Sequence, residues 1–333
     1  MSDTAFKALQ ISETEDGNYQ RNIIQRQIGD LPEGELLIRV RYSSLNYKDA
    51  LSAVGNKGVT RSYPHTPGID AAGVVEASES GDFKAGDEVI VTGFDLGMNT
   101  AGGYGQYIRI PAGWALPCPD GLDLHTAMIY GTAGFTAALS VAGLESREVA
   151  PADGPILVTG ASGGVGSVAV GILARAGYDV TAVTGKADQH DFLKHLGARD
   201  VVGRDVLDDP KGKPLLKPQW AGAVDTVGGG VLVNVLKSLY YGGTATCCGL
   251  VASPKMEGAT VFPFILRGVN LLGIDSVEVP LAKRPAIWQR LAGAWRVPAL
   301  EERARTVSLE ELDGEIDRIL AGEQVGRVVV ELD

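Results

Sequence analysis

A phosphate-binding turn is indicated near the middle of the chain, where Ala161, Gly163 and Gly166 form the pattern A-x-G-x-x-G within "VTGASGGVG". Glycines in this pattern let the backbone approach a pyrophosphate, and the N-terminus of the following helix stabilises its negative charge. A strand, "PILVTG", precedes the turn, and a helix, "VGSVAVGILARAG", follows it and ends at Gly177, as the motif requires. The sequence therefore predicts a bound dinucleotide. The residues expected at its phosphates are Ser162, Gly163, Gly164, Val165 and Gly166.

The same stretch also fits T-G-x-x-x-G-x-G from Thr159, the opening of a short-chain dehydrogenase. Those enzymes carry the motif at the start of the chain and transfer protons with a Tyr-x-x-x-Lys pair. Here the motif lies in mid-chain, and no tyrosine is followed by a lysine four residues later. We therefore reject this interpretation. A tight turn that binds no nucleotide is the alternative for the glycines.

The residues after the second strand of this half favour NADPH over NADH. An NAD enzyme usually places Asp or Glu about 20 residues beyond the glycines, where it binds the ribose 2′-hydroxyl. This chain has Thr184, Gly185 and Lys186 there, and Arg204 follows the next strand. A hydroxyl, a backbone N–H and two cations would attract a 2′-phosphate, which a carboxylate would repel. A solvated Lys186 and an ion pair between Arg204 and a nearby aspartate are the alternatives.

The pattern of apolar residues changes near residue 130 and indicates two domains. Before it, short alternating runs typical of antiparallel strands occur in "GELLIRVRYSSL", "GIDAAGVVEA", "GDEVIVTGF" and "GQYIRI",. After it, apolar strands alternate with helix-length segments, as in a doubly wound parallel sheet. A strand–helix–strand tail follows, whose last strand could return to the first domain. We predict an α/β protein with a β-rich catalytic domain over 1–129, completed by 303–333, and a Rossmann domain over 130–302.

Composition narrows the class of protein. A chain of 333 residues with 45% hydrophobic residues can bury a large core,. Its net charge of −11 argues against a nucleic-acid partner,. The three cysteines form neither a disulfide framework nor a cysteine-rich metal site,. Because the N-terminus has no apolar run and no uninterrupted apolar stretch is long enough to span a bilayer, we expect a cytoplasmic protein without a membrane segment.

An ordered set of segments resembles the acrylyl-CoA reductase branch of the zinc-free quinone oxidoreductases, in the medium-chain dehydrogenase/reductase superfamily. These segments are "SSLNYKDAL", "PGIDAAGVV", "YGTAGFTAALSV", "VTGASGGVGSVAV", "AVTGK" followed by "LGARDVV", and "FPFILRGVNLLGIDSV". The resemblance spans nearly the whole chain. It implies a GroES-like catalytic domain before the Rossmann domain, and NADPH-dependent reduction of acrylyl-CoA to propionyl-CoA.

The positions that hold catalytic zinc in other branches of the superfamily carry different residues here. The segments that correspond to a cysteine, a Gly-His-Glu element and a third ligand place Asn46, Ile69, and Gly131 or Thr132 at those positions. None of these can replace a thiolate or an imidazole on zinc. We therefore expect a reaction without metal. His65 beside Pro64 is best interpreted as a packing or loop residue.

The resemblance and the chemistry of the reaction suggest further site residues. Tyr47 could support proton delivery and contact the cofactor, and Asn46 could orient the substrate carbonyl; a tyrosine in a β-rich core can also simply pack. The resemblance implies cofactor contacts from three residues at strand ends and in the tail: Leu250, Ile274 and Arg327. Each of these also fits an ordinary structural role.

The predicted substrate is an anionic acyl-CoA, which needs a local basic patch on an acidic protein. The loop "GNKGVTRSYP" offers Lys57 and Arg61 for it. An NADPH quinone oxidoreductase is the alternative enzyme, and a non-catalytic NADPH-binding protein is the alternative of another class. We also expect a homodimer, because the apolar segment "VNLLGIDSV" would form an uncovered edge strand,.

Overall fold

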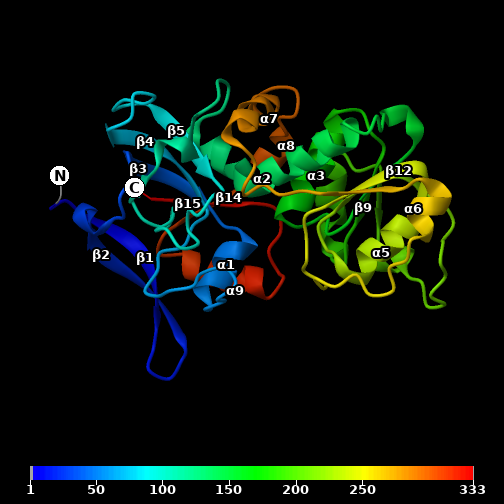
Figure 1. The fold of residues 1–333 in the computed structure, drawn as a ribbon, viewed down its shortest axis with the longest axis horizontal. Coiled ribbons are helices and arrows are strands. Elements are labelled where there is room, and N and C mark those ends of the chain that lie inside the picture. Colours follow the sequence, from blue (N-terminus) through cyan, green and yellow to red (C-terminus); the bar gives the residue numbers. More distant parts are fainter. Residues whose placement is uncertain (1–2, 333) are drawn as a thin grey trace. The chain divides into compact units, whose positions relative to one another are not determined.

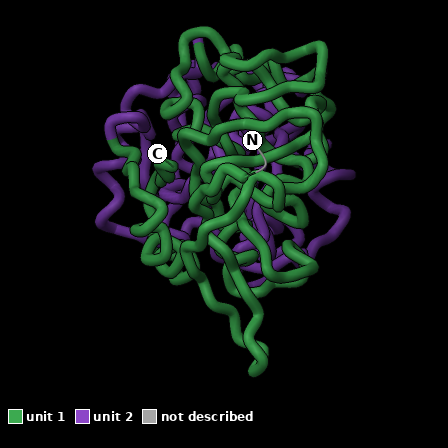
Figure 2. Tube along the Cα trace, turned by 90° about the vertical axis from the view of Figure 1, so that its left-hand side faces the viewer, with its two compact units in different colours: residues 1–132, 277–292, 303–333 green, residues 133–276, 293–302 purple. Residues whose placement is uncertain are grey.

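A computed structural model describes residues 3–332 (Figure 1). The chain divides into two compact units, coloured separately in Figure 2: the first comprises 1–132, 277–292 and 303–333, and the second comprises 133–276 and 293–302. The predicted boundaries assign 277–292 to the Rossmann domain, whereas the structure groups this segment with the first unit. Its place is explained by Arg284, whose buried guanidinium donates from Nη1 to the backbone oxygen of Thr92 at 2.7 Å.

The first unit is built mainly on antiparallel strands, with one parallel pair between the two strands of the C-terminal tail. Its seven-stranded sheet has the order β14-β15-β3-β4-β5-β7, and β6 also pairs with β3. The bounds are β3 (Leu36–Ser44), β4 (Asp70–Ser78), β5 (Glu88–Thr92), β6 (Tyr107–Ile110), β7 (Ala115–Pro117), β14 (Arg305–Ser308) and β15 (Val328–Glu331). A separate hairpin, missed by the sequence analysis, joins β1 (Ala5–Glu13) to β2 (Tyr19–Gln27). The predicted strands of this half are confirmed.

The C-terminal tail returns to this sheet as predicted. β15 pairs antiparallel with β3, with Val329 opposite Ser44. The beginning of β15 therefore lies at the end of β3, which brings Arg327 beside the residues that follow Ser44. The helix of the tail, α9 (Leu312–Leu320), contacts α1 (Tyr47–Ala53) in the same unit (Figure 1).

The second unit contains a six-stranded parallel sheet of order β10-β9-β8-β11-β12-β13. Renumbered along the chain, this is the 3-2-1-4-5-6 order of a Rossmann fold. The strand bounds are β8 (Ile156–Val158), β9 (Val180–Val183), β10 (Asp200–Val202), β11 (Trp220–Asp225), β12 (Leu239–Cys247) and β13 (Asn270–Gly273). β8, β9 and β11 are buried along their whole length because helices cover the faces of such a sheet,. The predicted doubly wound architecture is confirmed.

Helices connect the parallel strands. Their bounds are α3 (Gly164–Arg175), α4 (His190–His195), α5 (Gly229–Lys237) and α6 (Phe262–Arg267). After the last parallel strand, α7 (Arg284–Ala292) lies in the first unit, and α8 (Pro298–Glu301) belongs to the second and contacts α3. α3 ends as the sequence predicts, because Gly177 has a φ of 88°, a conformation that favours glycine,. Between β10 and β11 the chain forms only a short 3₁₀ turn, η5 (Arg204–Leu207), and a loop.

One helix in the described chain, α2 (Leu124–Glu145), is long and apolar enough to cross a membrane by length and composition alone. The structure buries 78% of its most apolar window inside the protein. Core helices of water-soluble proteins pass the same test, because a helix that is apolar all round can be buried in a large core. α2 is interrupted at Gly131, where φ is 50° and ψ is −153°.

Candidate active site

The glycine turn of the second unit has the geometry of a phosphate cradle. Gly163 is the N-cap of α3, so the first N–H groups of that helix follow the turn directly. A Cβ on Gly166 would lie 2.3 Å from the backbone oxygen of Gly160, which explains why this position needs glycine. Gly164 and Val165 open the helix. Unpaired N–H groups and the helix dipole together make this turn suitable for an anionic pyrophosphate.

A buried aspartate that the sequence analysis missed fixes this turn to the neighbouring strand. Asp225, at the end of β11, accepts hydrogen bonds from Thr159 Oγ1 at 2.7 Å and from the backbone N–H of Gly228 at 2.8 Å. Thr226 Oγ1 donates to the backbone oxygen of Thr159 at 2.8 Å. Burial raises the pKa of Asp225. The sequence signal for this residue was an acid at the end of the apolar strand "AVD". A carboxylate buried with such a strand needs hydrogen-bond partners.

The residues predicted to hold a 2′-phosphate lie together. Ser162 Oγ and Thr184 Oγ1 are 3.0 Å apart, and the backbone N–H of Lys186 donates to Thr184 Oγ1 at 3.1 Å. A Cβ on Gly185 would lie 2.7 Å from Nε of Arg204, so the guanidinium occupies the space that a side chain would take. Arg204 is exposed and forms no ion pair within the described part of the chain. Hydroxyl, amide and guanidinium donors fit an NADPH phosphate.

The other predicted contacts of the second unit stand at the carboxyl ends of the last two strands. Leu250, three residues beyond β12, is 58% exposed. Ile274 follows β13 and is partly buried, and its backbone N–H donates to the oxygen of Cys247 at 2.9 Å. In doubly wound sheets, ligands bind at this edge.

In the first unit, Asn46 and Tyr47 stand at the start of α1. Asn46 is the N-cap and is only 8% exposed, whereas Tyr47 is the first helical residue and is 39% exposed. The Asn46 side chain donates from Nδ2 to Asp70 Oδ2 at 2.8 Å. The amide therefore has a fixed orientation, while the phenol is available to a bound molecule.

Asp70 is a fully buried carboxylate with several donors around it. Besides Asn46, Ser44 Oγ donates to Oδ2 at 2.5 Å, and Thr132 donates from its backbone N–H at 2.9 Å and from Oγ1 at 2.5 Å. Such charge-assisted bonds are the ones that offset the cost of burying a charge. Gly131 makes the cluster possible, because a Cβ there would lie 2.5 Å from Asp70 Oδ2.

A second buried carboxylate, Asp49, lies in the same region. It accepts from the backbone N–H groups of Ile69 at 2.8 Å and Asn46 at 2.9 Å, and from the Tyr104 hydroxyl at 3.1 Å. Burial, together with the charge of Asp70, raises the pKa of Asp49 to about 7.

Arg327, predicted to contact the cofactor, lies in this cluster and is 1% exposed. Its Nε donates to the backbone oxygen of Ile129 at 2.8 Å, and Nη1 donates to Leu45 at 3.2 Å and to Asn46 Oδ1 at 3.4 Å. Nη2 has no hydrogen-bond partner in the described chain. Burial lowers the pKa of the guanidinium, and the nearby carboxylates oppose this shift.

The two cations predicted to bind substrate differ in their surroundings. Lys57 pairs with Glu13 at 2.8 Å and lies over the ring of Tyr63, 4.7 Å from its centroid. Arg61 is exposed, and its backbone N–H donates to Asn99 Oδ1 at 3.2 Å. The Lys57 charge is thus already balanced within the protein, whereas the Arg61 side chain has no ion pair among the described residues.

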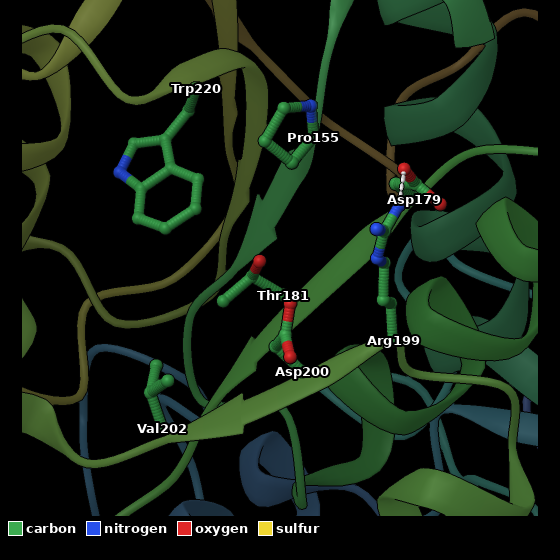
Figure 3. Close-up of a pocket in the computed structure, with 7 residues that line it drawn as sticks. All are labelled: Pro155, Asp179, Thr181, Arg199, Asp200, Val202 and Trp220. Atoms are coloured by element: carbon green, nitrogen blue, oxygen red, sulfur yellow. Dashed lines mark hydrogen bonds and ion pairs between the residues drawn. The ribbon is translucent and has the colours of Figure 1, made fainter.

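A cavity of about 390 Å³ lies elsewhere on the second unit (Figure 3). It is lined by Pro155, Asp179, Thr181, Arg199, Asp200, Val202 and Trp220. Several of these residues precede or begin strands, so the cavity lies near the amino ends of the strands, away from the edge where a nucleotide binds. Figure 3 shows the ion pair between Arg199 and Asp179, and the Trp220 indole nitrogen pointing away from the other labelled side chains.

Comparison with known proteins identifies the family. Residues 32–120 match the family described as alcohol dehydrogenase GroES-like domain, and residues 164–292 match the family described as zinc-binding dehydrogenase. A Ruegeria pomeroyi protein named acrylyl-CoA reductase is 46% identical over 329 residues, which cover 98% of this chain and 99% of the relative. The chain belongs to the acrylyl-CoA reductase branch of the medium-chain dehydrogenases/reductases. The predicted GroES-like and Rossmann domains are confirmed.

Two further relatives of this medium-chain dehydrogenase/reductase bear on the cofactor. An Escherichia coli protein solved with bound NADPH has a TM-score of 0.94 and 44% identity, covering 98% of this chain and 100% of that one. A Bacillus subtilis protein solved with NAD bound has a TM-score of 0.96 and 45% identity, covering 99% of this chain and 100% of that one. The same Bacillus subtilis protein is named putative quinone oxidoreductase, and its full sequence is 46% identical over 99% of each chain.

The zinc-ligand positions of this medium-chain dehydrogenase/reductase are occupied by residues with other contacts. Asn46 and Thr132 both bond to Asp70, and Ile69 is a core residue. His65 is buried, and its Nε2 lies 2.9 Å from the backbone oxygen of Gly97. Between residues 3 and 332, no cluster of three His, Cys, Asp or Glu side chains has the arrangement of a metal site. The donors at these positions suit a carboxylate network.

Proposed function

We propose that the protein catalyses the NADPH-dependent reduction of acrylyl-CoA to propionyl-CoA. The observation that carries this proposal is the 44–46% identity, over nearly the whole chain, to proteins of two bacteria named acrylyl-CoA reductase or probable acrylyl-CoA reductase. The substrate is an α,β-unsaturated thioester, so the reaction class is hydride addition to a conjugated double bond. The acyl-CoA is the small-molecule partner, and neither nucleic acid nor a membrane is part of the proposed function.

NADPH is the cofactor, and the residues of the second unit fit it. The N–H groups of the cradle at Gly163 donate to the pyrophosphate, and the hydroxyl of Thr184 and the guanidinium of Arg204 donate to the 2′-phosphate. No carboxylate follows β9 to repel that phosphate, since the next residues are Thr184, Gly185 and Lys186. When bound, NADPH supplies the hydride that reaches the β-carbon of the substrate.

The catalytic roles fall to residues of the first unit. Negative charge develops on the thioester oxygen as the β-carbon is reduced, and hydrogen-bond donors stabilise it. Tyr47 is the donor we assign to this charge and to proton delivery at the α-carbon, because its phenol is partly exposed,. Asn46 is the residue we assign to orienting the thioester carbonyl, and its own side chain is held by hydrogen bonds to Asp70 and Arg327. A conjugated thioester spreads charge and needs no metal ion.

A quinone reductase is the second candidate function, and the Bacillus subtilis relative named putative quinone oxidoreductase supports it. Steady-state NADPH oxidation with acrylyl-CoA, crotonyl-CoA, free acrylate and a quinone panel separates the candidates. The proposal expects the highest kcat/KM with acrylyl-CoA. A higher kcat/KM with a quinone would favour the second function, and NADPH binding without turnover would favour a non-catalytic protein.

We also propose that the protein forms a homodimer in the cytoplasm. β13 is the last strand of its sheet, and α6 near it carries exposed apolar side chains, among them Phe262, Ile265 and Leu266. Exposed apolar side chains beside an uncovered strand are suited to pairing with a second copy. Light scattering at micromolar protein tests the dimer, and a monomer would contradict it. Cell fractionation tests the location.

A further inference from the structure

Lys48 is a half-buried cation without an anionic partner. It is the second residue of α1, directly after Tyr47. Its Nζ lies 4.0 Å from the sulfur of Met98, and it forms no ion pair among the described residues. A thioether is only a weak acceptor for an ammonium group. The protein has 41 acidic against 30 basic side chains, yet no described carboxylate, including that of the next residue Asp49, forms an ion pair with Lys48.

The position of Lys48 is also unfavourable for the helix. The first turn of a helix exposes unpaired N–H groups with partial positive charge, which repel a cation. Partial burial adds a desolvation cost that an acceptor normally offsets. A residue that breaks a local rule without a visible compensating contact often has a functional reason. Among the described residues, the Lys48 ammonium thus meets only the weak acceptor of Met98.

A second unpaired cation adjoins the same loop. The backbone N–H of Arg61 donates to the side chain of Asn99, which directly follows Met98. The Lys48 side chain and the Arg61 backbone thus contact two neighbouring residues of the first unit, Met98 and Asn99. Lys57, in contrast, is balanced by Glu13. Of these three cations, Lys48 and Arg61 have charges that no described carboxylate balances.

We propose that Lys48 and Arg61 bind phosphate groups of the CoA moiety of the substrate. This inference rests on the proposed function, because it names where that anionic substrate is held. A protein of net charge −11 repels a polyanion unless local cations attract it. Lysine suits phosphate as a compact charge, and arginine adds a planar fork of donors. Lys48 therefore replaces Lys57 in the basic patch expected from the sequence.

The test compares two substrates and a matched control variant. Lys48→Gln removes the charge, Lys48→Arg keeps it, and Lys7→Gln removes a charge that is already paired with Glu310 at 2.9 Å. Acrylyl-CoA is compared with the acrylyl thioester of N-acetylcysteamine, which has no phosphate. We expect Lys48→Gln to raise KM for acrylyl-CoA about tenfold, as for one charge-assisted contact, with little change in kcat. KM for the short thioester should not change, Lys48→Arg should retain most of the affinity, and Lys7→Gln should resemble wild type.

Other results would overturn the inference. An unchanged KM in Lys48→Gln would mean that the ammonium does not meet the phosphates. An equal loss of kcat with both thioesters would assign Lys48 to the reacting carbonyl instead. Calorimetric binding of coenzyme A tests the phosphate site without any turnover, so it separates the two proposals. If the wild-type protein reduces no enoyl-CoA, only the proposed function fails. A weaker affinity of Lys48→Gln for coenzyme A would still locate the phosphate site. Equal thermal midpoints would confirm that each variant is folded.

Discussion

The side chains of Asn46 and Asp70 share a hydrogen bond of 2.8 Å between Nδ2 and Oδ2. The predicted catalytic amide is therefore held by a carboxylate, and its Oδ1 accepts from Arg327 at 3.4 Å. By the resemblance described above, the zinc-ligand positions of the superfamily correspond to Asn46, Ile69, and Gly131 or Thr132. In this chain Asn46 and Thr132 both donate hydrogen bonds to Asp70, so its carboxylate connects these two positions.

Gly131→Ala should destabilise the protein. A Cβ at this position meets Asp70 Oδ2 and Ser44 Oγ at 2.5 Å, and the φ of 50° is unfavourable for alanine. We expect a loss of about 2–4 kcal/mol in the free energy of unfolding, from overpacking and backbone strain together. Urea denaturation measures it. Gly230→Ala in α5, where no atom lies within 4 Å, is the control and should be neutral or slightly stabilising,. Equal effects of both substitutions would contradict the account.

Asp49 should make stability fall as pH rises toward neutrality. Its pKa is about 7 in the folded protein, against about 3.9 for an unperturbed aspartate. Between these values the folded state holds a proton that the unfolded state has lost, so the free energy of unfolding decreases with rising pH. Denaturation from pH 4.5 to 7.5 measures the slope. Asp49→Asn should flatten it, and Glu257→Gln at an exposed position should not. The same slope in wild type and Asp49→Asn would be evidence against this origin.

Arg204→Ala should reduce the preference for NADPH. The guanidinium lies over Gly185, and its only proposed ligand group is the 2′-phosphate, which NADH lacks. Loss of one charge-assisted contact costs about 1.5–3 kcal/mol, so the ratio of affinities should shrink about tenfold or more. Fluorescence titration with both cofactors measures this ratio. Arg199→Ala, which removes a guanidinium paired with Asp179, is the matched control. Equal weakening of both cofactors by Arg204→Ala would assign Arg204 to the fold.

Tyr47→Phe should lower kcat much more than it weakens the binding of NADPH. The substitution removes one hydroxyl from a side chain that is 39% exposed, so folding should be little affected. Loss of a general acid reduces rates about 100-fold or more. Steady-state kinetics with acrylyl-CoA provide the measurement. Tyr241→Phe, at a position 84% exposed, serves as the control. If Tyr47→Phe retains wild-type kcat, the phenol has no part in proton delivery.

Most of the fold could be predicted from the sequence because the apolar residues follow a regular pattern in each half. They alternate with polar residues along the strands of the first half, and in the second half apolar strands alternate with helix-length segments. The glycine turn, its flanking strand and helix, and the return of "GRVVVEL" to the first sheet all follow from local patterns. The β1–β2 hairpin was missed because it forms its own two-stranded sheet and its second strand is rich in polar residues. The place of segment 277–292 was not foreseen either, since it depends on the long-range contact between Arg284 and Thr92.

The site was predictable where one motif contains several of its residues, and less so where contacts are distant in sequence. Ser162 Oγ and Thr184 Oγ1 are 3.0 Å apart, because these residues follow two neighbouring strands of the Rossmann sheet, β8 and β9. The roles assigned to the cofactor and substrate residues remain predictions. Nothing local in "QVGR" shows that Arg327 is buried beside Asn46, and nothing in "GNKG" shows that Lys57 pairs with Glu13. Both depend on chain segments brought together by the fold.

The most direct test of the central claim is to follow the hydride. The protein is incubated with acrylyl-CoA and NADPH deuterated at the transferred position of the nicotinamide, and the thioester product is analysed by mass spectrometry and NMR. The account predicts propionyl-CoA with one deuterium at its β-carbon, formed with a higher kcat/KM than any quinone reduction. Failure to form propionyl-CoA, or deuterium at the α-carbon, would contradict it.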